Sequence, residues 1–536
     1  MPEEAIALLR WKSSLPSQTK TLLSSWRPLV GHSTNSSSHY DICNWVGITC
    51  NSPAAERVKQ ITLSSMGLQG MLHDFNFSSF PHLVYFDLFN NTLSGIIPSH
   101  IGTLSKLKYL DLSFNQFFGN VPSEIGKLRY LTDLYLNSNN LSGSIPTSLG
   151  NLSNLTFLYL CVNQFSGPIP QEIGNLKHLV DLRLSFNNLS GSIPASLGNL
   201  SNLTTLYLSK NQLSGPIPQD IGNLKYLIDL QLSTNNLSGS IPASLSNLSN
   251  LTTLYLFQNQ LSGPIPQEIG NLKHLIDLQL YLNNLSGSIP ASLGNLSNLN
   301  TLFLFKNQLS GLIPQEIGNL KHLINLQLSN NNLNGCIPAS LGNLSNLITL
   351  YLFKNQLSGP ILQEIGNLKH LTDLSLYTNN FNGSIPAPLD PSQTVRLGSR
   401  RGDLRRFSSD KFFVSANSDS SNSFVLLHFS SSSQFTFIIS YTSLTLSESL
   451  KELSIDMGRL KLQSGIKAID EEPEECNSSS GRGALACMLN SEVGSVLSVM
   501  RRNVRWGSRY MLGDDQLEHS LIQFEGIKKE NIFMAP

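Results

Sequence analysis

Apolar residues follow one fixed rhythm over most of the chain. The phrase L-x-x-L-x-L-x-x-N-x-L-S-G-x-I-P returns every 24 residues, and inside it leucines alternate with other residues, as in Leu134-Tyr135-Leu136. This period-2 alternation is typical of a half-buried strand, so each phrase predicts a short strand, a turn and a return path. The copies run without a break over residues 58–389, and the first, Val58 to Leu72, is slightly irregular.

An asparagine ends each predicted strand. We expect its amide to hydrogen bond to turn backbone groups that would otherwise be buried unpaired. The glycine four residues later, such as Gly143, is expected to adopt a backbone geometry costly for other residues, and the proline after it, such as Pro146, to stiffen the return path. The strand-ending asparagines, called the grid asparagines below, are Asn91, Asn115, Asn139, Asn163, Asn187, Asn211, Asn235, Asn259, Asn283, Asn307, Asn331, Asn355 and Asn379.

A period of about 20–29 residues with this spacing is typical of leucine-rich repeats. A single repeat cannot bury its apolar side, so neighbouring repeats must stack. The predicted fold is therefore an α/β repeat solenoid with a parallel β-sheet on its concave face, made of about 14 repeats over residues 57–389. The leucines, asparagines, glycines and prolines of the phrase are structural, so we expect function at the variable positions between them.

The first 56 residues have a different character. Residues 3–26 predict an amphipathic helix, with Ala5, Leu8, Leu9, Trp11 and Leu15 as its apolar positions. An exposed solenoid end needs a cap, which a short disulfide loop can provide. The motifs LLRWK at residues 8–12, SSW at 24–26 and CNWVGITC at 43–50 resemble the N-terminal cap of plant leucine-rich-repeat receptor kinases and receptor-like proteins. The L-S-G-x-I-P turn resembles the plant-specific repeat subtype.

This resemblance spans residues 3–389 and implies a superhelical extracellular domain at the plasma membrane. It implies a Cys43–Cys50 disulfide, a peptide or protein ligand, a co-receptor as further partner, and a role in signal perception or defence. The chain begins almost at the cap, so we expect no signal peptide. We expect no membrane span, because the most apolar segment, residues 424–446, is interrupted by polar residues. No kinase signature follows the repeats, so we do not expect kinase activity.

The segment after residue 389 is unrelated to the repeats. Residues 390–456 are rich in serine and arginine and predict a disordered linker. No cysteine-paired closing cap follows the last repeat, so we expect fraying at that end of the solenoid. Residues 457–523 resemble the extreme N-terminus of plant GNOM-class ARF guanine-nucleotide exchange factors, a regulatory segment far from the catalytic domain, and residues 457–536 predict a partly helical tail. One hypothesis is therefore a fused gene model that carries an inactive exchange-factor fragment.

Aromatic residues gather at the outward strand positions in the second half of the solenoid. Rigid aromatic surface often supplies much of the energy of recognition. Residues 191–238 and 239–286 are two copies of a double repeat, and four of their seven differences lie one or two residues before a grid asparagine. Alternatively, the rings stack on each other along the sheet and need no ligand. The candidate ligand-binding residues are Tyr207, Tyr255, Phe257, Tyr281, Phe303, Phe305, Tyr351, Phe353 and Tyr377.

Net charge, the remaining cysteines, the histidines and the sequons add little to the predicted function. The formal net charge is zero, so nothing indicates nucleic acid. Cys161 and Cys336 lie seven repeats apart, at roughly 34 Å, too far for a disulfide. No cofactor, metal site or catalytic set is expected, since the histidines His178, His274, His322 and His370 are copies within one repeated phrase. The N-x-S/T sequons give Asn35, Asn76, Asn90, Asn140 and Asn188 as glycosylation candidates.

The sequence favours a non-catalytic ligand-recognition module of the receptor-ectodomain type, binding a peptide or protein on the concave face. A secreted enzyme inhibitor similar to polygalacturonase-inhibiting proteins is the alternative, because that family shares the cap and the repeat subtype. A trafficking role through the exchange-factor segment is a third hypothesis.

Overall fold

A computed structural model describes residues 2–28, 42–51, 57–382, 394–396, 411–418, 421–429 and 435–440. The chain divides into two units, residues 1–399 and residues 400–536. The first unit holds the cap and the repeats. In the second, β31 (Lys411–Ser418), β32 (Ser421–Phe429) and β33 (Phe435–Ser440) form an antiparallel meander. The predicted helical tail at 457–536 lies outside the described residues.

Where we predicted a single helix over residues 3–26, the structure has two short helices. Helix α1 spans Pro2–Ser14 and α2 spans Ser17–Leu22. Pro16 separates them because its ring restricts the preceding residue and its nitrogen cannot donate a helical hydrogen bond. Trp11 and Trp26 are buried with ring centroids 6.0 Å apart, and the Trp11 indole N–H donates to the Met71 carbonyl at 2.7 Å. The helices are therefore tied to the first repeat by both packing and hydrogen bonding.

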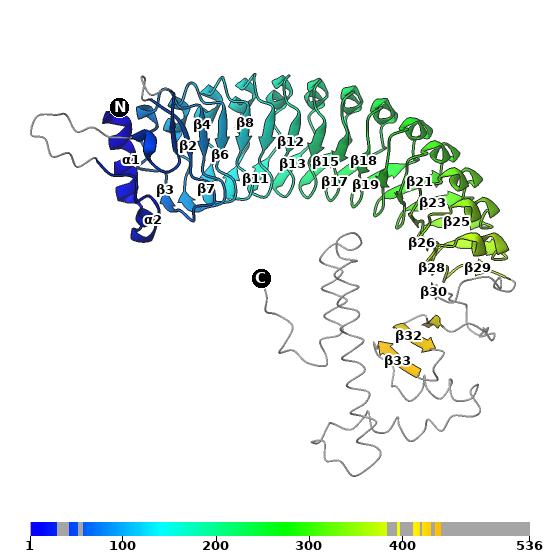
Figure 1. Cartoon of the computed structure of the whole chain (residues 1–536). Coiled ribbons are helices and arrows are strands. Elements are labelled where there is room, and N and C mark those ends of the chain that lie inside the picture. The colour runs from blue at the N-terminus through cyan, green and yellow to red at the C-terminus, as the bar shows by residue number, and fades with distance from the viewer. Residues whose placement is uncertain are drawn as a thin grey trace, which may run out of the picture. The chain divides into compact units, whose positions relative to one another are not determined.

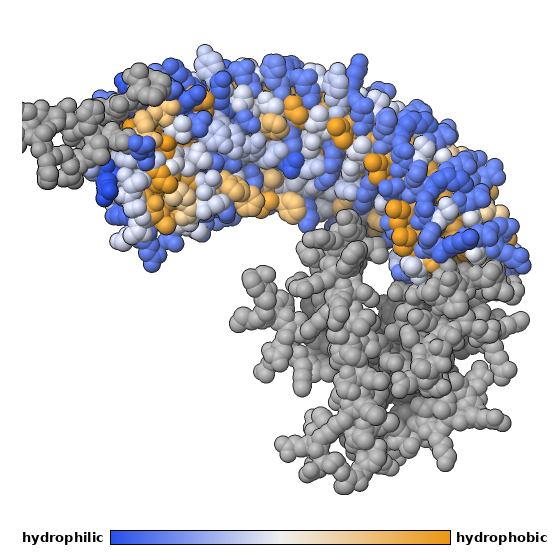
Figure 2. Space-filling model, viewed as in Figure 1, coloured by the Kyte–Doolittle hydropathy of each residue, from blue (hydrophilic) through white to orange (hydrophobic). Residues whose placement is uncertain are grey.

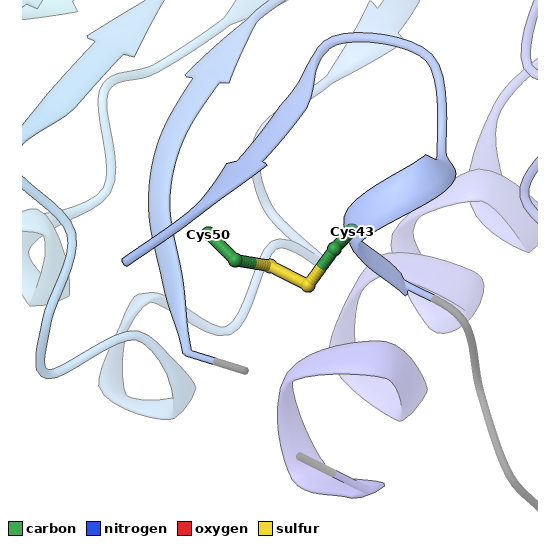
Figure 3. Close-up of a disulfide and its surroundings, with 2 residues drawn as sticks. All are labelled: Cys43 and Cys50. Atoms are coloured by element: carbon green, nitrogen blue, oxygen red, sulfur yellow. A yellow bond between two sulfur atoms is a disulfide. The ribbon is translucent and has the colours of Figure 1, made fainter. Parts of the chain in front are cut away.

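A disulfide joins the remaining parts of the cap. Cys43 lies in η1 (Ile42–Asn44) and Cys50 ends β1 (Ile48–Cys50), and the two form the expected disulfide (Figure 3). Strand β1 pairs antiparallel with β2, the first strand of the solenoid. The cap thus covers the first repeat through main-chain bonds as well as through the tryptophans.

The leucine phrases form the predicted parallel sheet, called the inner sheet below. Successive strands pair in register with an offset of one repeat, for example Leu134 with Leu158. The leucines on either side of the outward residue are fully buried, as Leu134 and Leu136 show. The inner strands are β2 (Val58–Thr62), β4 (Tyr85–Asp87), β6 (Tyr109–Asp111), β8 (Asp133–Tyr135), β10 (Phe157–Tyr159), β12 (Asp181–Arg183), β14 (Thr205–Tyr207), β16 (Asp229–Gln231), β18 (Thr253–Tyr255), β20 (Asp277–Gln279), β22 (Thr301–Phe303), β24 (Asn325–Gln327), β26 (Thr349–Tyr351), β28 (Asp373–Ser375) and β30 (Thr394–Arg396).

A second parallel sheet follows the turns. It has 14 strands in chain order, one per repeat. Its strands are β3 (Gln69–Met71), β5 (Thr92–Gly95), β7 (Gln116–Asn120), β9 (Asn140–Gly143), β11 (Gln164–Gly167), β13 (Asn188–Gly191), β15 (Gln212–Gly215), β17 (Asn236–Gly239), β19 (Gln260–Gly263), β21 (Asn284–Ser288), β23 (Gln308–Gly311), β25 (Asn332–Gly335), β27 (Gln356–Gly359) and β29 (Asn380–Phe381).

Each return path holds a 3-10 turn instead of an α-helix. The turns are η2 (Phe77–Ser79), η3 (Ser99–Thr103), η4 (Ser123–Lys127), η5 (Thr147–Asn151), η6 (Gln171–Asn175), η7 (Ala195–Asn199), η8 (Gln219–Asn223), η9 (Ala243–Asn247), η10 (Gln267–Asn271), η11 (Ala291–Asn295), η12 (Gln315–Asn319), η13 (Ala339–Asn343) and η14 (Gln363–Asn367). Helical turns need more width than the ~4.8 Å between paired strands, so the stack of repeats bends toward the inner sheet. Figure 1 shows the resulting arc of stacked repeats.

The grid asparagines bond as predicted. The side-chain amide of Asn139 donates to the carbonyls of Leu112 and Leu136 at 2.9 and 3.2 Å. Its oxygen accepts the Phe117 N–H at 2.9 Å. Each such side chain therefore satisfies backbone groups of two successive repeats and locks their stacking. The glycine prediction is also confirmed, because Gly143 has φ +73°.

The end of the solenoid differs from our expectation. Strand β30, inside the predicted linker, pairs in parallel with β28 and adds one strand to the inner sheet beyond the last grid asparagine. Its residues Thr394 and Val395 continue the pairing register of Asp373 and Leu374. Regular secondary structure therefore extends past residue 389, into residues where the composition predicted a disordered linker.

Candidate ligand-binding face

The outward side chains of the inner sheet form parallel rows, because every repeat places its residues in the same register. Two rows matter here. The first residues of β12, β16, β20 and β28 are Asp181, Asp229, Asp277 and Asp373, which we call the carboxylate row. The aromatic rings two residues before the grid asparagines lie just beyond the strand ends. Figure 2 shows that apolar side chains gather in separate patches along the solenoid, among polar ones.

The carboxylate row accepts hydrogen bonds from tyrosines on the neighbouring inner strands. The Tyr207 hydroxyl donates to Asp229 at 2.5 Å, and the Tyr255 hydroxyl donates to Asp277 at 2.6 Å. Tyr351 donates to Asp373 at 2.9 Å in the same way. Each tyrosine thus bonds a carboxylate of the following repeat, which fixes the ring direction. The three predicted tyrosines Tyr207, Tyr255 and Tyr351 are half-buried on this face.

The environment of the two central carboxylates, Asp229 and Asp277, disfavours their charged form. Gln231 donates to Asp229 at 3.2 Å, and Gln279 donates to Asp277 at 3.0 Å. Burial nevertheless raises the pKa of Asp229, although hydrogen bonds from Tyr207 and Gln231 partly oppose it. Burial raises the pKa of Asp277 as well, against the bonds from Tyr255 and Gln279. Their hydrogen bonds therefore do not fully replace the water that these carboxylates lose.

Arg183 is the one basic residue at the outward position that ends the inner strands β4 to β28. Its Nη2 lies 2.8 Å from Asp181 Oδ2, and its Nε lies 3.0 and 3.2 Å from the two carboxylate oxygens. The guanidinium carbon lies 4.6 Å from the Tyr159 ring centroid and 5.0 Å from that of Tyr207. This arrangement combines a two-point ion pair with cation–π contact from both neighbouring strands.

One double repeat lacks both halves of the tyrosine–carboxylate pair. Phe303 on β22 takes the place of the tyrosine, and Asn325 on the next strand, β24, takes the place of the aspartate. Phe303 is only 6% exposed, because the rings of Tyr281 and Phe305 lie 6.3 and 6.1 Å from it. Phe303 therefore differs from the other candidates, which keep part of their surface in solvent.

The other aromatic candidates stack along the sheet. Tyr281 lies between Phe257 and Phe305, with centroids 4.5 and 4.3 Å apart and nearly parallel planes. Phe353 and Tyr377 form a second stack at 4.5 Å. The stacking alternative is thus confirmed as geometry. It leaves a ligand role open, since all five rings remain half-buried and not covered.

The other residues singled out in the sequence are glycosylation candidates and cysteines. Asn76, Asn90, Asn140 and Asn188 are exposed, whereas Asn35 lies outside the described residues. Cys161 and Cys336 are free thiols. Within the described ranges, no group of three histidine, cysteine, aspartate or glutamate residues is placed to hold a metal ion. In the same ranges, no helix is long and apolar enough to cross a membrane.

Comparison with known proteins decides the family. A family profile described as "Leucine-rich repeat region" matches residues 57–215 and 195–311, and "Leucine rich repeat N-terminal domain" matches residues 1–51. A third, "Leucine Rich Repeat", matches residues 322–344 and 346–368. The chain belongs to the leucine-rich-repeat family.

The solved structures similar to this leucine-rich-repeat protein include plant receptor ectodomains. The crystal structure of PEPR1–AtPEP1 is 37% identical, covers 74% of this chain and 56% of that chain, and gives a TM-score of 0.69. The Arabidopsis receptor kinase HAESA, in complex with the peptide hormone IDA and the co-receptor SERK1, is 32% identical. That match covers 77% of this chain and 70% of the HAESA chain, with a TM-score of 0.60. The predicted resemblance to plant receptor-like ectodomains is confirmed.

Two curated relatives correspond to the two resemblances that we predicted for different parts of the chain. The ARF guanine-nucleotide exchange factor GNOM of Arabidopsis thaliana is 65% identical over 79 residues, which is 14% of this chain and 5% of GNOM. A probable leucine-rich repeat receptor-like protein kinase of Arabidopsis thaliana is 47% identical over 99 residues, 18% of this chain and 8% of that kinase. The resemblance to the GNOM class is thus confirmed as well, and the matched segments span only a small part of each relative.

Sequence reasoning missed the carboxylate row and the role of Arg183. The signal was present, because aspartate and threonine alternate at the first strand position while tyrosine and glutamine alternate at the last, as in Asp229, Tyr255, Asp277 and Gln279. Reading those alternations as cross-strand pairs required the register, which the structure supplies.

Proposed function

We propose that the solenoid is a non-catalytic recognition module that binds an extended peptide along its inner sheet. Its place would be the plant cell surface, in signal perception or defence. The observation that carries the proposal is one continuous face on which Tyr207, Tyr255 and the rings Phe257, Tyr281 and Phe305 are held by neighbouring repeats. Side chains fixed before binding lose little entropy when a ligand arrives.

The similar structures support a peptide as the ligand class. HAESA was crystallised with a peptide hormone and a co-receptor, and its chain is similar to this one over most of the solenoid. A co-receptor is accordingly part of the proposal. Extracellular location follows the same reasoning and is supported by a disulfide in the cap, since disulfides persist in oxidising compartments.

The test is a selection from a random peptide library with the full chain as bait, followed by binding measurements on variants. Phe257→Ala with Phe305→Ala removes the two rings stacked on Tyr281. This double variant is expected to bind a selected peptide at least about tenfold more weakly, because stacked aromatic surface carries much recognition energy. Tyr226→Ala is the matched control, since Tyr226 is 59% exposed and lies outside the inner strands.

Two results would contradict the proposal. One is equal weakening by Tyr226→Ala, and the other is a selection that enriches no peptide. Thermal unfolding of the double variant must be measured alongside, because loss of the fold would show that the rings are structural only.

A further inference from the structure

The protein contains its own example of how the inner sheet holds a cation. The Arg183 guanidinium lies against Asp181 and contacts the rings of Tyr159 and Tyr207 on the two flanking strands. Three parts make this site: a carboxylate at the start of a strand and a tyrosine ring on each side. A guanidinium satisfies all three at once, because it is flat, charged and a multiple donor.

The same parts recur two strands later without a cation. Asp229 begins β16, and the rings of Tyr207 and Tyr255 stand on the flanking strands β14 and β18. Gln231 occupies the place of the arginine and donates to Asp229 at 3.2 Å, but it brings no charge. Arg183 acts on Asp229 only from a distance, since it is ion-paired to Asp181.

Asp277 repeats the carboxylate and one of the two tyrosine rings. It begins β20 next to Tyr255 on β18, and Gln279 takes the arginine place, whereas the other flanking strand, β22, carries the buried Phe303. Within the described residues the ion pairs are His73–Asp74 and Arg183–Asp181, so neither Asp229 nor Asp277 has a cationic partner there. Two strands later, at the start of β24, Asn325 takes the place of the aspartate, which interrupts the series before Asp373.

The distance between the Asp229 and Asp277 carboxylates limits the conformation that a ligand with two cations can adopt. Strands β16 and β20 are separated by β18, so the two carboxylates are about 9.6 Å apart. A peptide in the polyproline II conformation rises about 3.1 Å per residue with three residues per turn, so side chains three residues apart point the same way about 9.3 Å apart. An extended β-strand fails here, because its side chains three residues apart point to opposite sides.

We infer that Asp229 and Asp277 are two guanidinium-binding sites for a peptide in polyproline II conformation with arginines three residues apart. The inference rests on the proposed function and adds the chemistry and register of the ligand. The raised pKa values of both carboxyls agree with it, since a cation would supply the charge partner that burial withholds.

The experiment is titration calorimetry of the full chain with blocked synthetic peptides. Arg-Pro-Pro-Arg is the probe, and Arg-Pro-Arg, Arg-Pro-Pro-Pro-Arg and the citrulline form of the probe are its comparisons. We expect the probe to bind at least about tenfold more tightly than each of the others. Asp277→Asn should remove this preference, whereas Glu268→Gln, an equal charge change on the exposed turn η10, should not.

Two further variants use the internal example directly. Gln279→Arg should fill the Asp277 site with the protein's own guanidinium and abolish the preference for the probe. Arg183→Gln should open a third site at Asp181, so that Arg-Pro-Pro-Arg-Pro-Pro-Arg gains at least about tenfold over the probe. Together they separate a specific site from general attraction to negative charge.

Equal binding of all spacings, no binding of the probe, or insensitivity to Asp277→Asn would overturn the inference. These outcomes differ from failure of the proposed function. A library-selected peptide that loses affinity in the Phe257→Ala, Phe305→Ala variant but not in Asp277→Asn would retain the binding face and refute only the arginine register.

Discussion

Replacing one central grid asparagine, Asn235→Ala, tests whether these side chains hold the repeats together. The Asn235 amide donates to the carbonyls of Leu208 and Leu232 at 3.0 and 3.2 Å, and its oxygen accepts the Leu213 N–H at 3.0 Å. The residue is only 7% exposed, so water cannot readily replace these bonds. The alanine variant leaves one buried donor and weakens two buried carbonyls.

The expected loss follows from those three bonds. Each contributes a net ~1 kcal/mol, and an unsatisfied buried group adds ~1–3 kcal/mol. We therefore expect Asn235→Ala to lower the free energy of unfolding by about 4–6 kcal/mol. Urea unfolding followed by far-ultraviolet circular dichroism measures it, with the exposed residue Gln260 replaced by alanine as the control. A loss below about 1 kcal/mol, or one equal to the control, would refute the reasoning.

Three other predictions concern charge, covalent structure and turns. Asp277→Asn should raise the melting temperature at pH 7 but not below pH ~4. The pKa of Asp277 is raised in the folded state, so its protonated form stabilises the fold below the unfolded-state pKa, and this contribution is lost as the pH rises through the folded-state pKa. A lower melting temperature of Asp277→Asn at pH 7 would contradict this. Cys43→Ser with Cys50→Ser should destabilise the cap by about 2–3 kcal/mol, measured by tryptophan fluorescence in urea, and an unchanged midpoint would count against it. Gly239→Ala should cost about 1 kcal/mol in the same assay because Gly239 has φ +76°, and a neutral variant would show that the turn adapts.

The repeat framework could be predicted because its physical causes are local and repeated. The leucine period, the bonding of Asn139 and the positive φ of Gly143 all follow from residues within one phrase or its neighbour. The Cys43–Cys50 disulfide was implied by the family resemblance, since spacing alone did not assign it.

Other features depend on packing between segments that the sequence does not order. The burial of Phe303 arises from rings on neighbouring repeats, and the bond of Tyr255 to Asp277 joins residues 22 positions apart. The first helix ends before Pro16, a break that the apolar pattern does not show. Strand β30 forms by pairing with β28, although the composition around it indicates a linker.

The inner sheet connects the fold to its proposed use. Strand register sets the position of every outward side chain, so a change of one aspartate or tyrosine changes the face without touching the leucine core. The concerted replacement at Phe303 and Asn325 illustrates this, since the tyrosine hydroxyl and its carboxylate acceptor are both absent while Leu302 and Leu326 stay buried. A repeat protein can thereby vary its ligand while keeping its stability.

The most direct test of the binding face is photo-crosslinking with a library-selected peptide that carries a benzophenone group, followed by mass spectrometry of the full chain. The account predicts cross-links on the inner sheet, at or beside the strands β16 (Asp229–Gln231), β18 (Thr253–Tyr255), β20 (Asp277–Gln279) and β22 (Thr301–Phe303). Cross-links confined to the 3-10 turns, to the second sheet or to residues 400–536 would contradict it.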